Sequence, residues 1–282
     1  MTILEAKGPG EVASEILMMR SARRSSFLIV EGVTDSKFFA PRTDPAECEI
    51  VIGGGKKAVV GGVALLEQKK VDGTLGIVDD DCDSIDFVPT LPKNIVAIDE
   101  ARDLDALLFW SGAFESVLAE FVDPLRLARS GGPQAVRTMI VRIASVFGDL
   151  RRCAAIHSWS VDFSKTFGPR RYVSPALQFD EARLFQDLEV KLSLAEKDIR
   201  DQVALLAPGP PSRTCQGHDL LTILSLALSR HGVLDWKSKS EHEIASLLRL
   251  AYQKESWLSS KLYYDVASWE RASPPYRILC SA

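Results

Sequence analysis

The stretch GTLGIVDDDCDSIDF, residues 73–87, joins a short apolar run to a cluster of acidic side chains. The run is typical of a buried strand, and it ends at Asp79, Asp80 and Asp81, with Asp83 following after one residue. Four carboxylates within five positions repel one another and resist burial unless a cation or water relieves the repulsion. The stretch is therefore either a hydrated turn or a metal site at the end of a strand.

Three similar apolar runs lie on either side of this stretch and predict further strands. Their sequences are FLIVEG (27–32), EIVIGG (49–54) and NIVAID (94–99). The segments around them have helical patterns: EVASEILMMRSARR (11–24), DSKFFA (35–40) after Thr34, KAVVGGVALLEQKK (57–70) and LDALLFWSGAFESVLAEF (104–121). Strands that alternate with helices imply a parallel sheet with helices packed on its faces. We therefore expect an α/β fold for this part of the chain.

After about residue 121 the pattern becomes mainly helical. Residues 134–156 and 180–207 carry long helical patterns, and three shorter ones follow, LLTILSLALSRHG, EHEIASLLRLAYQK and KLYYDVASWERA. The sequence thus predicts two domains. Residues 1–125 form the α/β domain with its opening helix, and residues 126–282 form a mainly helical region for substrate or partner binding.

Composition narrows the class of protein. The formal net charge of −4 gives no overall attraction to nucleic acid, so a polyanion would have to meet a local basic patch or bound cations. The five cysteines are scattered without zinc spacing and no signal-peptide pattern opens the chain, which favours a reducing, cytoplasmic compartment. The most apolar run, LLTILSLAL (220–228), is too short to cross a bilayer, so we expect no membrane association.

Acidic side chains follow three of the predicted strands. Glu31 follows FLIV, Asp79 and Asp81 follow TLGIV, and Asp99 and Glu100 follow NIVAI. In an open α/β sheet, ligands bind beyond the carboxyl ends of the strands, where these side chains are expected to meet. Hard oxygen ligands of this kind suit Mg²⁺ or Mn²⁺, which keep water and substrate phosphate as their remaining ligands.

The residues of the acidic cluster need not share one role. Alternate residues of an extended chain point the same way, so Asp79 and Asp81 are expected to face one site while Asp80 faces away. Asp83 either supports a second metal or closes the turn, and the whole cluster has the alternative interpretation of a hydrated loop whose acids cap the next helix.

The two principal motifs resemble a known family. FLIVEGVTD, followed about fifty residues later by LGIVDDDCD, is similar to the Toprim domain of topoisomerases, bacterial primases and overcoming-lysogenization-defect nucleases. The resemblance covers roughly residues 25–120. It implies a compact α/β fold in which a strand-end glutamate and a DxD pair serve metal-dependent phosphoryl transfer on nucleic acids. Glu31 would be the glutamate, and Asp79 and Asp81 would be the DxD pair.

A narrower resemblance rests on four segments, VEGVTDSKFF, IGGGKKAVV, GIVDDDCD and RDLDALLF. Together they resemble the standalone Toprim proteins that act as effectors beside an ABC-type ATPase in the PARIS anti-phage system. That resemblance implies an endoribonuclease that cuts transfer RNA and has an ABC-type ATPase partner. The REGE-like continuation of topoisomerases and the zinc-binding segment of primases are both missing, so strand passage and primer synthesis are not expected.

Three further residues are candidates for the same site. Asp105, in RDLDALLF, stands where similar proteins favour glutamate, and it is either a metal ligand or an acid in the first turn of a helix. Lys56 and Lys57, in GGGKK (53–57), either contact a substrate phosphate beside a nest of backbone amides or are solvated lysines in a turn.

Basic pairs in the second half of the chain offer a weaker signal. Arg151 with Arg152, and Arg170 with Arg171 beside Tyr172, could contact single-stranded RNA or could be salt-bridge partners.

The predicted function is metal-dependent phosphodiester cleavage. Asp79 and Asp81 would hold one or two Mg²⁺ ions, and Glu31 would ligate a metal or act as general base on the attacking water. RNA is the favoured substrate, and a homodimer is possible. Two alternatives stay open: a Toprim-fold binding or assembly module without catalysis, and a DNA nuclease of the overcoming-lysogenization-defect type.

Overall fold

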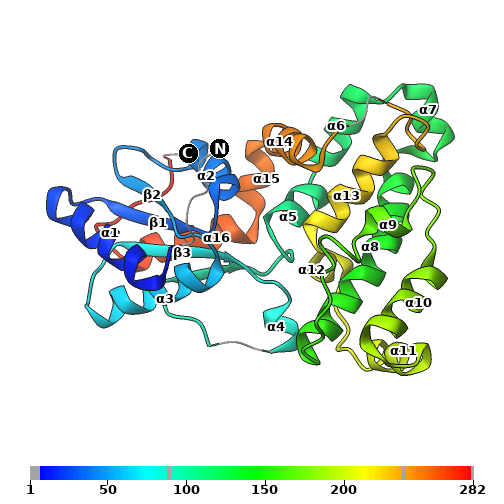
Figure 1. Cartoon of the computed structure of the whole chain (residues 1–282). Coiled ribbons are helices and arrows are strands. Elements are labelled where there is room, and N and C mark those ends of the chain that lie inside the picture. Colours follow the sequence, from blue (N-terminus) through cyan, green and yellow to red (C-terminus); the bar gives the residue numbers. More distant parts are fainter. Residues whose placement is uncertain (1–6, 88–89, 237–238, 281–282) are drawn as a thin grey trace. The chain divides into compact units, whose positions relative to one another are not determined.

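The computed structural model describes residues 7–87, 90–236 and 239–280, and it shows an α/β protein (Figure 1). The chain divides into two compact units. The sheet unit comprises Met1–Asp80, Pro89–Ile98 and Lys254–Ala282, and the helical unit comprises Asp81–Val88 and Asp99–Gln253.

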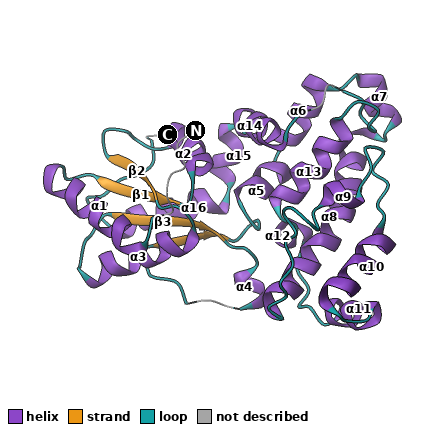
Figure 2. Ribbon diagram, viewed as in Figure 1, coloured by secondary structure: helices purple, strands orange, loops and turns teal. Residues whose placement is uncertain are grey.

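A four-stranded, entirely parallel sheet forms the centre of the sheet unit (Figure 2). Its strand order is β2-β1-β3-β4. All four strands expected from the apolar runs are confirmed: β1 (Ser26–Val30), β2 (Cys48–Ile52), β3 (Thr74–Asp79) and β4 (Ile95–Ile98). The central strands β1 and β3 are buried along almost their whole length, as expected for strands covered on both faces. The carboxyl ends of β1 and β3 therefore lie beside each other.

Helices flank this sheet and contribute to its hydrophobic core. They are α1 (Pro9–Ala22), α2 (Val33–Phe39), α3 (Lys56–Gln68), α15 (Lys254–Ser259) and α16 (Lys261–Ala272), with a 3-10 turn at Ala40–Arg42. Val12 and Ile16 of α1 pack with Val59 and Val63 of α3 against the strands. The core thus ties the opening helix to the sheet.

Two adjacent glycines in α3 permit this packing. A Cβ atom on Gly62 would lie 2.8 Å from Cγ1 of Val12, and one on Gly61 would lie 2.7 Å from Cγ of Pro9. Any larger residue would push α1 away from α3. The glycines that weaken the helix propensity of α3 are therefore explained by the close approach of α1.

The last described segment of the chain also belongs to the sheet unit. Nε1 of Trp269, on α16, donates a hydrogen bond to Oδ1 of Asn94 at 2.9 Å, immediately before β4. Trp257 packs edge-on against Phe38 with ring centroids 5.8 Å apart. The ring of Tyr276 occupies the space where Gly73 would carry a side chain, and Gly73 has the left-handed φ of +72°.

The boundary expected near residue 125 falls within the helical unit, and residues 254–282 are part of the sheet unit. Periodicity shows that KLYYDVASWERA has an apolar face, but it does not show which element covers that face. Here α16 packs against β4, which lies more than 150 residues earlier in the chain. The hydrogen bond between Trp269 and Asn94 spans 175 residues.

Helices are the only regular elements described after residue 99. The helical unit contains α4 (Asp83–Asp86), α5 (Leu104–Trp110), α6 (Ala113–Phe121), α7 (Pro124–Arg129), α8 (Gly132–Ile156), α9 (Pro169–Tyr172), α10 (Glu181–Leu192), α11 (Glu196–Ala204), α12 (Pro211–Thr214), α13 (Gly217–Leu228) and α14 (Glu241–Ala251). Nearly every residue of α13, which contains the run LLTILSLAL, is buried, so α13 is the core helix of this unit. No helix in the described part of the chain combines the length and apolar composition needed to span a membrane.

Candidate functional site

Glu31 connects the ends of three strands. It follows β1 directly, and its Oε1 atom accepts a hydrogen bond of 2.9 Å from the backbone N–H of Asp79, the last residue of β3. Its backbone carbonyl accepts bonds of 3.0 Å from the N–H groups of Gly54 and Gly55, in the loop after β2. The structure therefore brings Glu31, Asp79 and the GGGKK loop together at the carboxyl edge of the sheet.

The segment after Glu31 is fixed by a local capping arrangement. Gly32 is the N-cap of α2, and its N–H donates to Oδ2 of Asp35 at 2.7 Å. Asp35 lies in the first turn of α2, where a carboxylate also complements the helix dipole. The abrupt change from strand to helix leaves Glu31 at the strand end with a half-buried side chain.

Most of the acidic cluster lies beyond the end of the strand. β3 ends at Asp79, Asp80 is only 2% exposed, and Asp81 and Cys82 adopt left-handed φ values of +55° and +68°. Side chains alternate between two faces only where the backbone is extended. The backbone is not extended at Asp81, so the expectation that alternation places Asp79 and Asp81 on one face is wrong. Asp81 opens the helical unit, where its N–H donates to the carbonyl of Arg102 at 3.0 Å.

The GGGKK loop is held by the sheet unit itself. Lys56 is the first residue of α3, and its ammonium donates to the carbonyl of Asp80 at 3.0 Å, whereas Lys57 is exposed. The amides of Gly54 and Gly55 are used by Glu31, so these two N–H groups do not form the open nest suggested by the sequence. Gly55 has a φ of +116°, which a residue with a side chain adopts only with strain.

Asp83 is the first residue of the short helix α4, whose N-cap is Cys82. Its carbonyl accepts a bond of 2.8 Å from the N–H of Phe87. Its half-buried carboxylate lies in the first turn of that helix. Asp86, at the end of α4, forms a bidentate ion pair with Arg152 at 2.9 and 2.6 Å, and both side chains are 3% exposed.

Asp103, which sequence reasoning passed over, is the buried acid next to Asp105. It is the N-cap of α5, and its carboxylate accepts bonds of 2.8 Å from the N–H of Ala106 and of 2.8 Å from the N–H of Gly217, the first residue of α13. Burial raises the pKa of Asp103 to about 6, although the two N–H donors act in the opposite direction. An Asp directly before the apolar run LDALLF is an N-cap signal that could have identified it.

Asp105 lies in the first turn of α5 with a half-buried side chain. The guanidinium of Arg249, on α14, lies 4.0 Å from its carboxylate. Asp105 is thus an acid in the first turn of α5, and the N-cap of that helix is Asp103.

The arginines proposed as RNA contacts form ion pairs within the helical unit. Arg151 binds the fully buried Asp219 through two bonds of 2.8 Å, and Arg171 pairs with Asp187 at 2.8 Å. Arg170 binds Glu241 at 2.9 Å. The salt-bridge interpretation therefore accounts for these side chains.

No family model matches the chain, and no curated protein matches it either.

The residues at the strand ends fit a divalent cation through the chemistry of their donors. Across residues 7–87, 90–236 and 239–280, no three His, Cys, Asp or Glu side chains already converge as a metal-binding group. Mg²⁺, however, binds through one or two carboxylates together with water and substrate phosphates, and Glu31 and Asp79 provide two carboxylates on hydrogen-bonded neighbours. Any metal at this edge would therefore be held by few protein ligands.

Proposed function

We propose that the protein is a metal-dependent phosphodiesterase of the Toprim type whose centre contains Glu31 and Asp79. The observation that carries the proposal is the 2.9 Å hydrogen bond from the Asp79 N–H to the Glu31 carboxylate at the ends of two adjacent parallel strands. Functional side chains of open α/β sheets gather at this edge. The motifs FLIVEGVTD and LGIVDDDCD support the same assignment through their resemblance to Toprim domains.

Within this proposal, the chain's own residues have distinct tasks. The N–H of Asp79 orients the Glu31 carboxylate, which ligates the metal or accepts a proton from the attacking water. Asp79 is a metal ligand, and Asp81 is the second acid of the DxD pair. A bound Mg²⁺ or Mn²⁺ would stabilise the negative charge that develops on the phosphate and the leaving oxygen. Lys56 and Lys57 are proposed to contact a substrate phosphate, and Asp83 and Asp105 are candidates for support of a second ion.

The proposed substrate is RNA, and the proposed role is that of an anti-phage effector that cuts transfer RNA beside an ABC-type ATPase. This part of the proposal rests on the four segments that resemble the standalone Toprim effectors. Hydrolysis by a metal-activated water does not require a 2′-hydroxyl group, so substrate choice has to come from other parts of the chain.

Cleavage assays with matched variants test the proposal. End-labelled transfer RNA, single-stranded RNA and DNA are incubated with the wild type, Glu31→Gln and Glu47→Gln, in Mg²⁺, in Mn²⁺ and in EDTA. Glu31→Gln keeps the size of the side chain but removes its charge, and Glu47 is an exposed glutamate of the same unit. We expect metal-dependent cleavage of RNA by the wild type and Glu47→Gln, and loss of at least about 100-fold in rate for Glu31→Gln.

The other outcomes separate the alternatives. Cleavage of DNA with intact RNA would favour a nuclease of the overcoming-lysogenization-defect type. Stable binding of nucleic acid by the wild type without cleavage in either metal would favour a binding module. A Glu31→Gln variant with the wild-type rate would overturn the assignment of the centre.

A further inference from the structure

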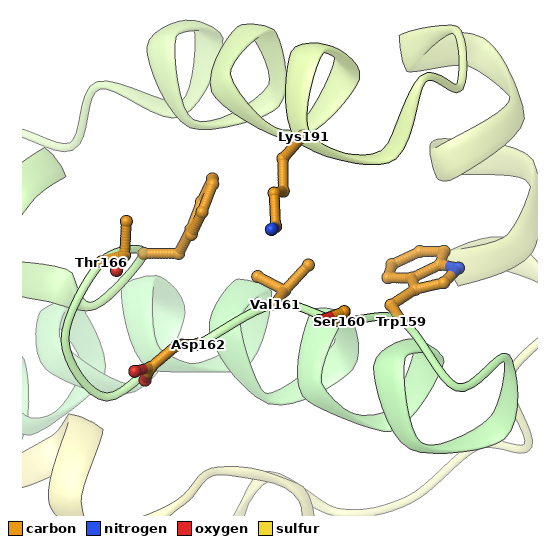
Figure 3. A pocket seen from close by; sticks show the side chains of 7 residues that line it. Trp159, Ser160, Val161, Asp162, Thr166 and Lys191 are labelled. Carbon is orange, nitrogen blue, oxygen red and sulfur yellow. The ribbon is translucent and has the colours of Figure 1, made fainter.

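The helical unit contains a cavity of about 400 Å³ between the loop that follows α8 and helix α10. Figure 3 shows the side chains that line it. These are Trp159, Ser160, Val161, Asp162, Thr166, Phe167 and Lys191. None of them belongs to the proposed metal centre, and all lie in one compact unit.

One wall of the cavity is aromatic. The indole of Trp159 is stacked with the imidazole of His157, with ring centroids 5.8 Å apart and planes inclined by 24°. Trp159 is half-buried, and Phe167 is 6% exposed. The indole of Trp159 therefore offers a ring surface that a planar ligand can cover, and the stack with His157 restricts movement of the indole.

The loop that carries these rings is ordered by its own hydrogen bonds. The N–H of Trp159 donates to the carbonyl of Ala154 at 2.9 Å, and the N–H of Phe167 donates to the carbonyl of Asp162 at 2.9 Å. The carboxylate of Asp162 accepts bonds of 3.0 Å from the N–H groups of Ser164 and Lys165. The negative charge of Asp162 is thus engaged inside the turn, and Figure 3 shows its side chain pointing away from Lys191.

Lys191 brings a positive charge into the cavity. Figure 3 shows its ammonium extending from α10 toward the loop with Trp159, Ser160 and Val161. Lys191 is exposed, and it makes no ion pair with any residue that the structure describes. Asp187, one turn earlier on α10, is occupied by Arg171 at 2.8 Å and by the hydroxyl of Tyr172 at 2.9 Å. The cavity therefore combines an aromatic wall with a cation that lacks a protein counter-charge.

We propose that this cavity binds a nucleotide, with its base against Trp159 and its phosphate at Lys191. Base stacking on an aromatic side chain, with a basic residue at the phosphate, is the general mode of single-stranded nucleic acid binding. The volume of about 400 Å³ lies in the range of small-ligand sites, and the hydroxyls of Ser160 and Thr166 can hydrogen-bond to the sugar or base. The inference rests on the proposed function in one respect, since it identifies the nucleotide as part of the RNA substrate.

Equilibrium binding in EDTA tests this site without requiring cleavage. A fluorescein-labelled single-stranded oligoribonucleotide is titrated with the wild type and with Trp159→Ala, Trp159→Phe, Lys191→Gln and Lys197→Gln. Lys197 is exposed and lies at the start of α11, outside the cavity, so Lys197→Gln is the matched charge control. Circular dichroism verifies that each variant is folded.

The expected results are specific to each side chain. Loss of one stacking platform should weaken binding by roughly 5- to 150-fold in Trp159→Ala, with much of the affinity retained in Trp159→Phe. Lys191→Gln should lower the slope of log K against log salt by about 0.7, the value for one phosphate contact on a single strand, whereas Lys197→Gln should leave it unchanged. Wild-type affinity and salt slope in both Trp159→Ala and Lys191→Gln would overturn the proposal.

A second arm identifies the source of the nucleotide. Adenosine and uridine monophosphates are titrated against the same variants by isothermal calorimetry. Binding of the oligoribonucleotide that depends on Trp159 and Lys191 assigns the cavity to a strand, and the same dependence for the monophosphates alone assigns it to a free nucleotide. Binding is measured in EDTA, separately from the cleavage assays described above. Variants that lose binding, together with a wild type that does not cleave in those assays, would contradict the nuclease proposal only. Normal cleavage with unchanged binding in all variants would contradict this inference only.

Discussion

The Oε1 atom of Glu31 lies 2.9 Å from the backbone nitrogen of Asp79, so a side chain at the end of β1 completes the hydrogen bonding at the end of β3. Glu31 therefore has a structural task that is separable from any chemical one. Its hydrogen bond needs only an oxygen acceptor, whereas metal binding and proton transfer need a carboxylate.

Substitutions at Glu31 should separate these two tasks. Glu31→Gln retains an oxygen acceptor for the Asp79 N–H, and we expect its free energy of unfolding in EDTA to lie within about 0.5 kcal/mol of the wild type. Glu31→Ala leaves the N–H without that acceptor and should lose about 1–2 kcal/mol. Urea denaturation followed by circular dichroism measures both. Equal losses in the two variants would show that the hydrogen bond contributes nothing.

Asp103 should make stability depend on pH. Its pKa is raised from 3.8 to about 6 in the folded protein, so the folded state binds this proton more tightly than the unfolded state. Its contribution to the free energy of unfolding is therefore largest below about pH 4 and is lost as the pH rises to about 6.

The variant Asp103→Asn isolates this contribution. Because the amide cannot ionise, the difference in free energy of unfolding, wild type minus Asp103→Asn, should decrease between pH 4 and pH 6 and become constant above about pH 7. Urea titrations in this range provide the measurement. Parallel profiles for the two proteins would contradict the raised pKa of Asp103.

Gly62 should not tolerate a methyl group. Its Cβ would lie 2.8 Å from Cγ1 of Val12, so Gly62→Ala should lower the free energy of unfolding by about 1–3 kcal/mol despite the better helix propensity of Ala. Gly10, in α1, is the control, because nothing lies within 4 Å of its Cβ position. Gly10→Ala should therefore be neutral or up to about 1 kcal/mol more stable. Thermal melts rank the variants, and a stabilised Gly62→Ala would show that α1 moves easily.

The ion pair of Arg151 with Asp219 should matter far more than that of Arg170 with Glu241. Asp219 is fully buried, so Arg151→Ala leaves a buried carboxylate without its partner and should cost about 3–5 kcal/mol. The Arg170 side chain is 56% exposed, and Arg170→Ala should cost at most about 1 kcal/mol.

The double variant Arg151→Met with Asp219→Leu provides the internal control for the buried pair. Removing both charges together should recover a large part of the loss seen in Arg151→Ala, because no buried carboxylate remains. Chemical denaturation measures all variants. Additive losses at Arg151 and Asp219 would show that the two side chains act independently.

The sheet could be predicted from sequence because each of its strands is a continuous apolar run, which is typical of strands buried on both faces. The proximity of Glu31 and Asp79 was also predictable, because parallel strands place their carboxyl ends at one edge of the sheet. The backbone conformation of Asp81 was not predictable, because a left-handed residue after a strand leaves no periodic signal. Its φ of +55° breaks the alternation of side chains that was assumed for this residue.

Longer-range features of the fold lay beyond sequence patterns. Asp103 joins the N-terminus of α5 to Gly217, which is 114 residues away, and only the folded structure reveals that second partner. The basic pairs were visible, but their partners were not: Asp219 follows Arg151 by 68 residues. A charge pattern identifies an ionisable side chain, whereas tertiary packing decides whether its partner is a substrate or another part of the chain.

The hydrogen bond between Trp269 and Asn94 has a consequence for the order of events during synthesis. Domains generally fold as the chain leaves the ribosome, starting from the amino terminus. The sheet unit, however, includes residues 254–282, so all four strands and the entire helical unit are translated before its last helices exist. Its described packing can be completed only after the whole helical unit has been translated. For a protein proposed to cut RNA, this order would keep the nascent chain from being a finished enzyme until the helices that begin at Lys254 have been made.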